Sequence, residues 1–457
     1  MIQKTVKELT SMISVLNDYR SFENEKIKGI CIDTRKLEKG NLFVPFIGEN
    51  TDGHQFVAEA IEKGAAAALW QKGVPNPPLH LPILVVEDTL VALQELAKSY
   101  RNQLNLKVIG ITGSNGKTTT KDMVTNLLSL QYKVQKTEGN YNNHIGLPFT
   151  ILQLKEETEM AVLEMGMSGR GEIDFLSKLA NPDAVIITNI GESHLLDLGS
   201  REGIAEAKLE ILNGLKKNGY IVYFGDEPLL KEKFDLYNGE ATIHTFGKSE
   251  GNTIYPTEIT SSNNGSYFKV NHFDEEFYLP VLGTHNIMNA LSAMLMAKHF
   301  QIPFSMLNEG FKSLKLTNMR MELVKGNNGE NIINDAYNAS PTSMKAAIEL
   351  VSNLPGYSQK ILVLGDMLEL GPKEEEFHYE IGKSLEPEKI NYVFTYGNLS
   401  NQIARGAKES LSENQVYTFS DKQSLIEALK KRTNPETLVL VKASRGMKLE
   451  EVVTGLQ

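Results

Sequence analysis

Short apolar runs that alternate with amphipathic segments dominate two long parts of the chain. The first series of runs is Leu106–Ile111, Met160–Leu163, Ala184–Thr188 and Gly219–Phe224, and the second is Asn331–Ile333, Lys360–Leu364, Tyr392–Thr395 and Leu438–Val441. The segments between these runs repeat their apolar residues with a helical period. Strands that alternate with helices form parallel sheets covered by helices, so the pattern predicts two α/β domains.

The remaining segments follow other patterns. Residues 1–86 combine short predicted strands and turns with a small helix over Phe56–Lys63, and a second helix is predicted from Thr89 to Asn102. The more polar segment Thr242–Leu282 predicts a β-rich insert, which the helix Asn286–Lys298 follows. We therefore predict three α/β domains, over residues 1–86, 87–320 and 321–457.

The composition is that of an ordinary globular protein, with 41% hydrophobic and 23% charged residues. A net charge of −10 argues against nonspecific binding to nucleic acid or to an anionic membrane surface. The single cysteine, Cys31, excludes an intramolecular disulfide and a thiolate metal cluster. We find no signal-peptide core and no apolar stretch of about 18 residues, and therefore expect a cytoplasmic protein that does not insert into membranes.

The strongest chemical signal follows the strand Leu106–Ile111. The next residues include Gly113-Ser114-Asn115-Gly116-Lys117-Thr118-Thr119, and a helical pattern begins there. The two glycines let the backbone N–H groups turn towards phosphate oxygens, Lys117 would contact the β- and γ-phosphates, and Thr118 would ligate Mg²⁺. Position 111 is Ile where the longer P-loop has Gly, so this is a shorter variant. The strand–loop–helix context favours a nucleoside triphosphate site over a turn that is Gly-rich by chance.

Two further polar residues follow strands of the same series. Glu164 comes directly after Met160–Leu163, and His194 comes a short loop after Ala184–Thr188. Open α/β sheets bind ligands at the carboxyl ends of their strands. Each residue alone is compatible with an ordinary solvated loop position. Next to a phosphate-binding loop, a carboxylate and an imidazole favour a divalent-cation site.

Lys208 lies within an apolar helical stripe. Ile204, Ile211, Leu212 and Leu215 share its face of the predicted helix Ile204–Leu215. One interpretation is that its stem runs along the apolar surface and its ammonium reaches solvent. The other is a site that keeps Lys208 neutral enough to take up CO₂ as a carbamate, which converts a cation into an anionic metal ligand. The residues alone leave both interpretations open.

Taken together, these residues resemble the ATP-dependent Mur ligases of peptidoglycan synthesis. The resemblance covers essentially the whole chain in the family's order. It rests on the P-loop, Glu164-Met165-Gly166, the His194 loop, Ala207-Lys208, Gly283-Thr284-His285-Asn286-Ile287-Met288-Asn289-Ala290 and Arg320-Met321-Glu322. It implies a small α/β UDP-sugar-binding domain, a central P-loop ATPase domain with a mostly parallel sheet, and a Rossmann-like C-terminal domain that closes over ATP.

Several stretches are similar to the members of this family that add D-alanyl-D-alanine to UDP-N-acetylmuramoyl-tripeptide. These are Gly139–Pro148, Asp335–Pro341, Leu364–Gly371 and Lys442–Met447, although Ala443 stands where the family more often has Gly. The Asp-Asn-Pro-Arg signature of the diaminopimelate-adding relatives is missing from the last domain. The alternatives are a ligase of the same superfamily that adds one amino acid, or glutamate to a folate, and a non-enzymatic nucleotide-dependent switch.

The resemblance also implies roles for individual residues in a monomeric enzyme. ATP would be bound by Gly113, Ser114, Asn115, Gly116, Lys117, Thr118 and Thr119, with Asn286 and Asn289 at the adenine and with Arg320 and Asp335 at the ribose and phosphates. The UDP-sugar and peptide would be bound by Asp33, Thr34, Arg35, Asn140, Asn142, Asn143, Asn338, Lys442, Ser444 and Arg445. One Mg²⁺ would lie near Thr118 and Glu164, and a second near His194 and carbamylated Lys208. Lys117, Lys208, His194 and Glu164 would be the catalytic residues.

Three of these assignments have structural alternatives. Asn286 is also suited to cap the helix that follows it. Asp33, Thr34 and Arg35 fit an ordinary turn equally well. The amide-rich loop Gly139–Pro148 suits recognition of a polar peptide, but its composition is also typical of a turn.

Overall fold

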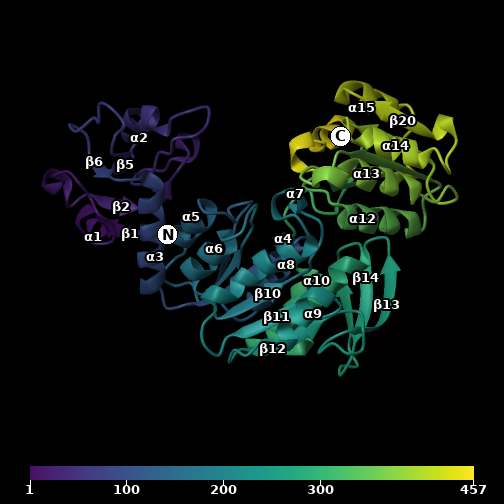
Figure 1. Cartoon of the computed structure of the whole chain (residues 1–457), viewed down its shortest axis with the longest axis horizontal. Helices are drawn as coiled ribbons and strands as arrows, with labels where there is room; N and C mark the ends of the chain where they lie inside the picture. Colours follow the sequence, from purple (N-terminus) through teal and green to yellow (C-terminus); the bar gives the residue numbers. More distant parts are fainter.

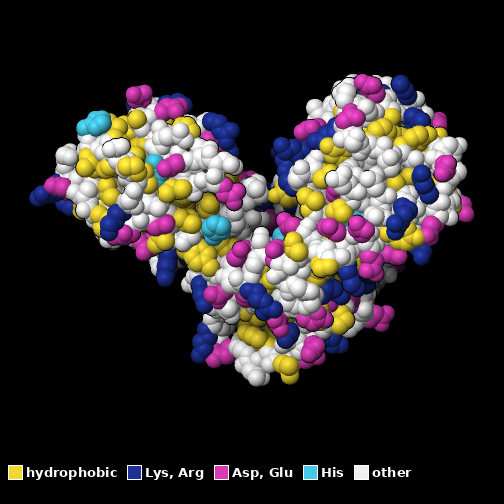
Figure 2. Space-filling model, turned by 45° about the horizontal axis from the view of Figure 1, so that its top comes forward, with side chains coloured by type: hydrophobic (Ala, Val, Ile, Leu, Met, Phe, Trp, Pro, Cys, Tyr) yellow, Lys and Arg dark blue, Asp and Glu magenta, His cyan; other side chains and the backbone are white.

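The computed structural model describes residues 1–457 and contains five β-sheets with the helices that cover them. In Figure 1 they form an N-terminal body (purple to blue), a central body (blue to green) and a C-terminal body (green to yellow). Figure 2 shows the N-terminal and C-terminal bodies as separate lobes on the central one, with a notch between them. No helix of the structure is both long enough and apolar enough to cross a bilayer.

Two small sheets build the N-terminal body. Its elements are β1 Gln3–Thr5, α1 Val6–Thr10, β2 Lys26–Lys28, β3 Ile30–Cys31, β4 Leu42–Phe43, α2 Val57–Glu62, β5 Ala67–Gln71 and β6 Ile83–Val86. β1 and β2 pair antiparallel, whereas β3 to β6 form a parallel sheet in chain order. The apolar run over residues 27–32 predicts one strand, but Gly29, with a φ of 77°, divides it between the two sheets. Glycine adopts this left-handed conformation without steric cost.

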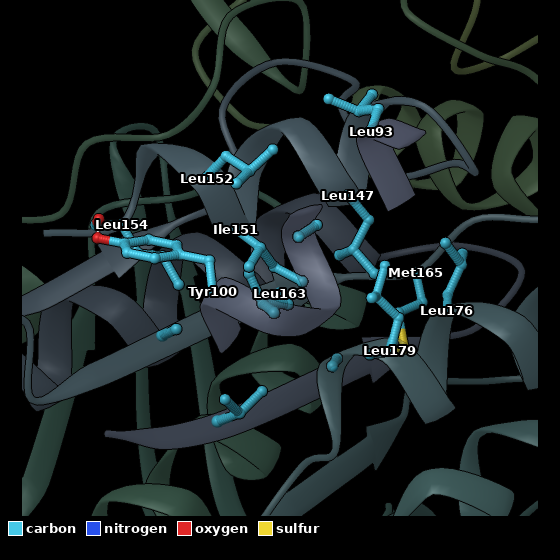
Figure 3. Close-up of a cluster of buried hydrophobic side chains, with 14 of the residues drawn as sticks. Leu93, Tyr100, Leu147, Ile151, Leu152, Leu154, Leu163, Met165, Leu176 and Leu179 are labelled. Atoms are coloured by element: carbon cyan, nitrogen blue, oxygen red, sulfur yellow. Dashed lines mark hydrogen bonds between the residues drawn. The ribbon is translucent and has the colours of Figure 1, made fainter. Parts of the chain in front are cut away.

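The helix α3 (Thr89–Gln103) joins the N-terminal body to the central one. Asp88 caps its first turn by accepting from Val91 N, and Tyr100 donates to Leu154 O at 2.8 Å. Figure 3 shows Leu93 and Tyr100 among side chains from the central body. One hydrophobic cluster of 44 buried residues extends from Ile2 to Phe234 and so includes the N-terminal body, α3 and one face of the central sheet.

The central body is built on a six-stranded parallel sheet with the order β12-β11-β10-β7-β9-β8. Its strands are β7 Lys107–Thr112, β8 Val134–Lys136, β9 Met160–Glu164, β10 Ala184–Ile187, β11 Tyr220–Phe224 and β12 Thr242–Phe246. Its helices are α4 Lys117–Leu128, α5 Gly146–Gln153, α6 Glu172–Ala180, α7 Leu195–Leu198, α8 Arg201–Leu209, α9 Pro228–Asp235, α10 Thr284–His299 and α11 Leu307–Lys312. Residues of α4 and α10 cover one face of the sheet, and residues of α3, α5, α6 and α8 cover the other.

The predicted β-rich insert is confirmed only in its second part. Strands β13 Pro256–Ser262, β14 Gly265–Val270 and β15 Glu276–Leu279 form a separate antiparallel sheet. Thr242–Phe246, placed in the insert by its polarity, is instead the edge strand β12 of the central sheet and pairs parallel with β11. An edge strand pairs with only one neighbouring strand and is less completely covered by helices, so its side chains need not be apolar.

The C-terminal body has a second six-stranded sheet, with the order β16-β17-β21-β18-β19-β20. Its elements are β16 Glu322–Lys325, β17 Asn331–Asp335, α12 Pro341–Asn353, β18 Gln359–Gly365, α13 Glu374–Lys383, β19 Tyr392–Tyr396, α14 Ser400–Ala407, β20 Val416–Phe419, α15 Lys422–Lys430, β21 Thr437–Lys442 and α16 Glu450–Leu456. Only β16, which the apolar pattern did not predict, runs antiparallel. Two separate apolar clusters lie on the two faces of the sheet, as expected for a Rossmann-like arrangement.

Candidate active site

A cavity of about 720 Å³ lies between the central and C-terminal bodies. Most residues predicted for the site line it: Ser114, Asn115, Gly116, Lys117, Thr119, Asn142, Asn143, Glu164, His194, Lys208, Asn286, Asn289, Arg320, Asp335, Asn338 and Lys442. Many of them come from the carboxyl ends of parallel strands and from the N-terminal turns of α4 and α10, whereas Lys208 lies in α8 and Arg320 lies between α11 and β16. This is where open α/β sheets bind their ligands.

The phosphate-binding loop is formed by two glycines with positive φ. Gly113 has φ 147° and Gly116, the N-cap of α4, has φ 80°. A side chain at Gly113 would overlap Thr188 Oγ1, so only glycine fits there. Lys117 folds back over the loop and donates to Gly113 O at 2.8 Å. Burial lowers the pKa of Lys117, Glu164 opposes this shift, and the nearby charge of Arg320 adds to it.

The loop after β10 holds the phosphate-binding loop in place. Asn115 N donates to Asn189 Oδ1 at 2.9 Å, and Asn189 Nδ2 donates to Asn115 O at 3.1 Å. Gly191 N donates to Ser114 Oγ at 2.8 Å. These bonds fix the loop at the start of α4, and the unpaired N–H groups of a helix N-terminus favour an anion there.

Replacing Gly116 by alanine is expected to weaken nucleotide binding. Alanine in the left-handed region costs about 1 kcal/mol, and its Cβ would lie 2.5 Å from Asn289 Oδ1. Asn289 must then move, and we expect the Kd for ADP to rise at least about tenfold in calorimetry. The matched control is Gly73→Ala, because Gly73 has φ 90° but no atom within 4 Å of an added Cβ. Equal weakening in both variants would contradict a specific role for Gly116.

Glu164 is the last residue of β9, and one of its two carboxylate oxygens has no hydrogen-bond partner. Its Oε1 accepts from Asn142 Nδ2 at 2.8 Å, while its Oε2 is buried and has no hydrogen-bond partner. Asn142, predicted to bind the peptide, therefore orients a candidate metal ligand. No three His, Cys, Asp or Glu side chains come together as a protein-only metal site. Glu164 and Thr118 fit Mg²⁺, which is usually bound by one or two protein oxygens, water and phosphate.

His194 faces the C-terminal body. Its φ is 64°, and its Nδ1 lies 2.8 Å from Glu369 Oε2 without hydrogen-bonding geometry. Leu196 N also donates to Glu369 O at 3.2 Å. Burial, then the charges of Lys117 and Lys208, lower the pKa of His194 to about 4. The imidazole is therefore neutral near pH 7, which is the form that binds metal ions.

Lys208 is almost completely buried. The residue exposes 2% of its surface, so the interpretation in which its ammonium reaches solvent is wrong. Burial, together with the charge of Lys117, holds the pKa of Lys208 well below its ordinary value. The predicted helix over 204–215 divides into α8 and a 3₁₀ segment, Glu210–Gly214, and Lys208 lies in the last turn of α8.

Next to the phosphate-binding loop, the two predicted asparagines form a chain of amide hydrogen bonds. Asn286 Nδ2 donates to Leu282 O at 2.7 Å, and Asn289 Nδ2 donates to Asn286 Oδ1 at 3.0 Å. Gly283 is the N-cap of α10, so Asn286 does not cap the helix. The neighbouring His285 was not predicted, although it belongs to the same motif. It lines the cavity, and burial lowers its pKa to about 4.

Charged residues from the segment before β16 and from the C-terminal body complete the cavity. The Arg320 guanidinium lies 4.2 Å from the ring centroid of Tyr337. Lys442 Nζ pairs with Asp335 Oδ2 and also donates to Asn338 O at 3.0 Å. Asp335, which was predicted to bind the ribose and phosphates, therefore forms an ion pair with Lys442 in this structure.

Eight predicted residues do not line the cavity. Gly113 and the buried Thr118 belong to the phosphate-binding loop and the first turn of α4 but lie behind its surface, and the other six are Asp33, Thr34, Arg35, Asn140, Ser444 and Arg445. Asp33 and Arg35 form an exposed ion pair of 2.7 Å in the N-terminal body. Arg445 pairs with Glu450 at 2.6 Å, and Ser444 Oγ accepts from Leu368 N at 2.9 Å. In this arrangement the side chain of Ser444 fixes a loop of the C-terminal body.

Several lining residues gave no signal in the sequence. Arg201 and Glu227 pair at 2.7 Å at the edge of the cavity. Thr342 Oγ1 donates to Glu192 Oε2 at 2.8 Å, which joins the C-terminal body to the loop that carries His194. Both pairs join residues that are far apart in the sequence, and the second also depends on how two bodies meet, so local sequence patterns do not encode them.

Comparisons with known proteins agree with this geometry. Three family descriptions match the chain: "Mur ligase family, catalytic domain" over residues 26–101, "Mur ligase middle domain" over 111–297 and "Mur ligase, glutamate ligase domain" over 319–445. A UDP-N-acetylmuramoyl-tripeptide–D-alanyl-D-alanine ligase of Bacillus subtilis is 52% identical over 100% of this chain and 99% of its own.

Solved structures give the same result. MurF from Acinetobacter baumannii superposes with a TM-score of 0.89 and 29% identity, over 100% of this chain and 99% of that one. MurF from Thermotoga maritima in complex with ADP has a TM-score of 0.80 and 30% identity, over 94% and 97% of the two chains. The three-body fold, the resemblance of the motifs and the full-length similarity agree, and the chain belongs to the Mur ligase family.

Proposed function

We propose that this chain is the ATP-dependent ligase that joins D-alanyl-D-alanine to UDP-N-acetylmuramoyl-tripeptide. The observation that carries the proposal is that one cavity unites the phosphate-binding Lys117 with Glu164, His194 and Lys208. The full-length similarity to relatives that bear this activity in their names supports the two substrates. A switch protein would need the phosphate-binding loop but not the buried lysine and imidazole beside it.

The reaction needs two steps, because a carboxylate is a poor acylating agent. In the first step, a terminal carboxylate oxygen of the tripeptide attacks the γ-phosphorus of ATP. The bond to the β,γ-bridging oxygen breaks, and an acyl phosphate and ADP form. In the second step, the amine of D-alanyl-D-alanine attacks the acyl carbon, phosphate leaves with the bonding electrons, and the amine nitrogen loses a proton. The product is an amide.

Both steps bring anions together, and the cations of the cavity offset their repulsion. When Lys117 exchanges its bond to Gly113 O for phosphate oxygens, its charge lies beside the transferring group. Arg320, whose charge contributes to the lowered pKa of Lys117, would add a second positive charge. The asparagines at the start of α10 would hold the adenine.

The residues of the site fit Mg²⁺ and a lysine carbamate. Glu164 Oε2 and the Thr118 hydroxyl would hold one ion, and His194 with carbamylated Lys208 a second. Mg²⁺ neutralises phosphate charge and polarises the phosphoryl oxygens. A buried lysine with a lowered pKa offers a neutral amine, whose nitrogen can attack CO₂ and release a proton. The carbamate would place a negative charge at a buried position where a protonated lysine is unfavourable.

The other predicted residues would bind the UDP-sugar and the peptide. We infer that Asp33, Thr34 and Arg35 bind the UDP-sugar, and that Asn140 and Asn143 lie along the peptide. Asn338, Lys442, Ser444 and Arg445 would meet the peptide or the dipeptide when the C-terminal body moves over the central one. Closure of this kind would keep water from the acyl phosphate. The monomeric state, the cytoplasmic location and the lack of nucleic-acid binding stay predictions.

The proposal is tested by measuring phosphate release with ATP, Mg²⁺ and UDP-N-acetylmuramoyl-tripeptide. We expect release to depend on D-alanyl-D-alanine and to yield a pentapeptide product in mass spectrometry. Parallel reactions with D-alanine, L-alanine or D-glutamate should release little phosphate. Equal turnover with a single amino acid, or release that ignores the dipeptide, would contradict the assignment.

A further inference from the structure

The P-loop helix α4 carries a buried carboxylate that the proposed chemistry does not use. Asp122 exposes only 1% of its side chain. Its Oδ1 lies 2.7 Å from Lys136 Nζ and 3.5 Å from the fully buried Lys121 Nζ. Its Oδ2 accepts from both Thr317 N at 2.8 Å and Thr317 Oγ1 at 2.9 Å. A buried carboxylate is destabilising unless charges and hydrogen bonds replace its water, and all of these partners do so.

Thr317 lies in the segment that joins the central and C-terminal bodies. Residues 314–321, between α11 and β16, form neither helix nor strand. On the C-terminal side of this segment, Met321 N donates to Asp335 Oδ1 at 3.2 Å. Asp122 therefore fixes the linker to the central body, and Asp335 fixes it to the C-terminal body.

The residues between these two attachments have an unusual backbone. Met319 has φ 62° and Met321 has φ 52°, which is the left-handed region that non-glycine residues rarely adopt. Such conformations cost about 1 kcal/mol or more each and persist only where the surroundings hold them. The linker therefore depends on its attachments for its shape.

Arg320 follows Thr317 by only three residues. Three residues of extended chain span at most about 10 Å, so an attachment at Thr317 limits where the guanidinium can lie. Arg320 lines the nucleotide cavity, as does Lys117, which begins the helix that carries Asp122. One rigid helix thus connects the position of Lys117 to that of Arg320.

We propose that Asp122 is a positioning residue for nucleotide binding: it clamps Thr317 to the P-loop helix and so sets Arg320 opposite Lys117. Residues 318–321 then act as the hinge about which the C-terminal body moves. The inference rests on the nucleotide site proposed above. Loss of the clamp lets Arg320 spread over more positions, so the affinity for ADP and ATP falls while the UDP-substrate site is unaffected.

The test compares ADP binding by calorimetry in Thr317→Val and Asp122→Asn. Thr317→Val keeps the branched shape and the backbone donor but removes the hydroxyl donor, and we expect the Kd for ADP to rise about threefold to tenfold. Asp122→Asn leaves only one acceptor oxygen, and we expect a rise of at least about tenfold. The double variant should bind ADP no more weakly than Asp122→Asn does, because both substitutions break the same contact between Asp122 and Thr317. The KM for the UDP-substrate should stay within about twofold of the original.

The variant Asn126→Ala distinguishes the proposed positioning role of Asp122 from a purely structural role. Asn126 lies one turn further along α4, and its Nδ2 donates to Ser313 Oγ at 2.9 Å, before the linker begins. Its loss should lower the melting temperature about as much as Thr317→Val but leave the Kd for ADP unchanged. The inference is wrong if Thr317→Val binds ADP like the original chain, or if Asn126→Ala weakens ADP equally. If Lys117→Ala also binds ADP normally, the nucleotide site itself is wrong.

Discussion

Lys117→Ala should lower the rate of ATP-dependent phosphate release by at least about a hundredfold while the chain stays folded. The ammonium is the one side-chain cation of the phosphate-binding loop, and removing a donor aimed at developing charge costs about a hundredfold to a thousandfold in rate. Burial lowers the pKa of Lys117, so its charge does not favour the folded state and the melting temperature should not fall. A coupled phosphate assay and differential scanning calorimetry measure the two effects.

The control for this variant is Lys408→Ala, which removes an exposed lysine beyond the end of α14. It should have the original rate and melting temperature. A fully active Lys117→Ala chain would refute the assignment of the loop to the phosphates. An inactive Lys117→Ala chain that also shows no unfolding transition in calorimetry would show that Lys117 is needed for folding instead.

Lys208→Ala should lose at least about a hundredfold in activity and regain part of it in formate. The truncation leaves a space where the lysine stem lay, and formate can place a carboxylate there. Chloride at the same ionic strength should not restore activity. Because the carbamate carbon comes from CO₂, the original chain in buffer with ¹³C-bicarbonate should also show a carbamate carbon signal that is absent from the variant.

Lys231→Ala, which removes a lysine exposed on α9, is the matched control and should not respond to formate. If Lys208→Ala is as active as the original chain, the carbamate is not part of the reaction. Loss of activity without rescue and without the carbon signal would leave Lys208 as a buried amine with a structural role.

The sequence predicted those parts of the site that one local pattern encodes. The strand, glycine loop and lysine around Lys117 are contiguous, so their arrangement follows from a few residues. Glu164 could be predicted because a strand end is visible as the end of an apolar run. The contact between His194 and Glu369 could not be predicted, because it depends on how the C-terminal body sits on the central one.

The same distinction explains the differences in the fold. Most central strands are buried on both faces and appear as apolar runs. The edge strands β8, β12, β16 and β20 are less buried, and β12 was misplaced while the other three were missed. Asn142 is a different case. Its amide suits a peptide, and only the folded structure shows that it orients Glu164.

One hydrophobic cluster includes the N-terminal body, α3 and one face of the central sheet, and this affects how the chain unfolds. The 44 residues form one continuous core, whereas the apolar clusters on the C-terminal sheet include only Leu282 from the central body. The N-terminal and central bodies therefore constitute one cooperative unit, and the C-terminal body constitutes another. Removing the first 86 residues would strip the cover from α3 and expose apolar surface to water, so that truncation at that end favours aggregation over an independent ATPase.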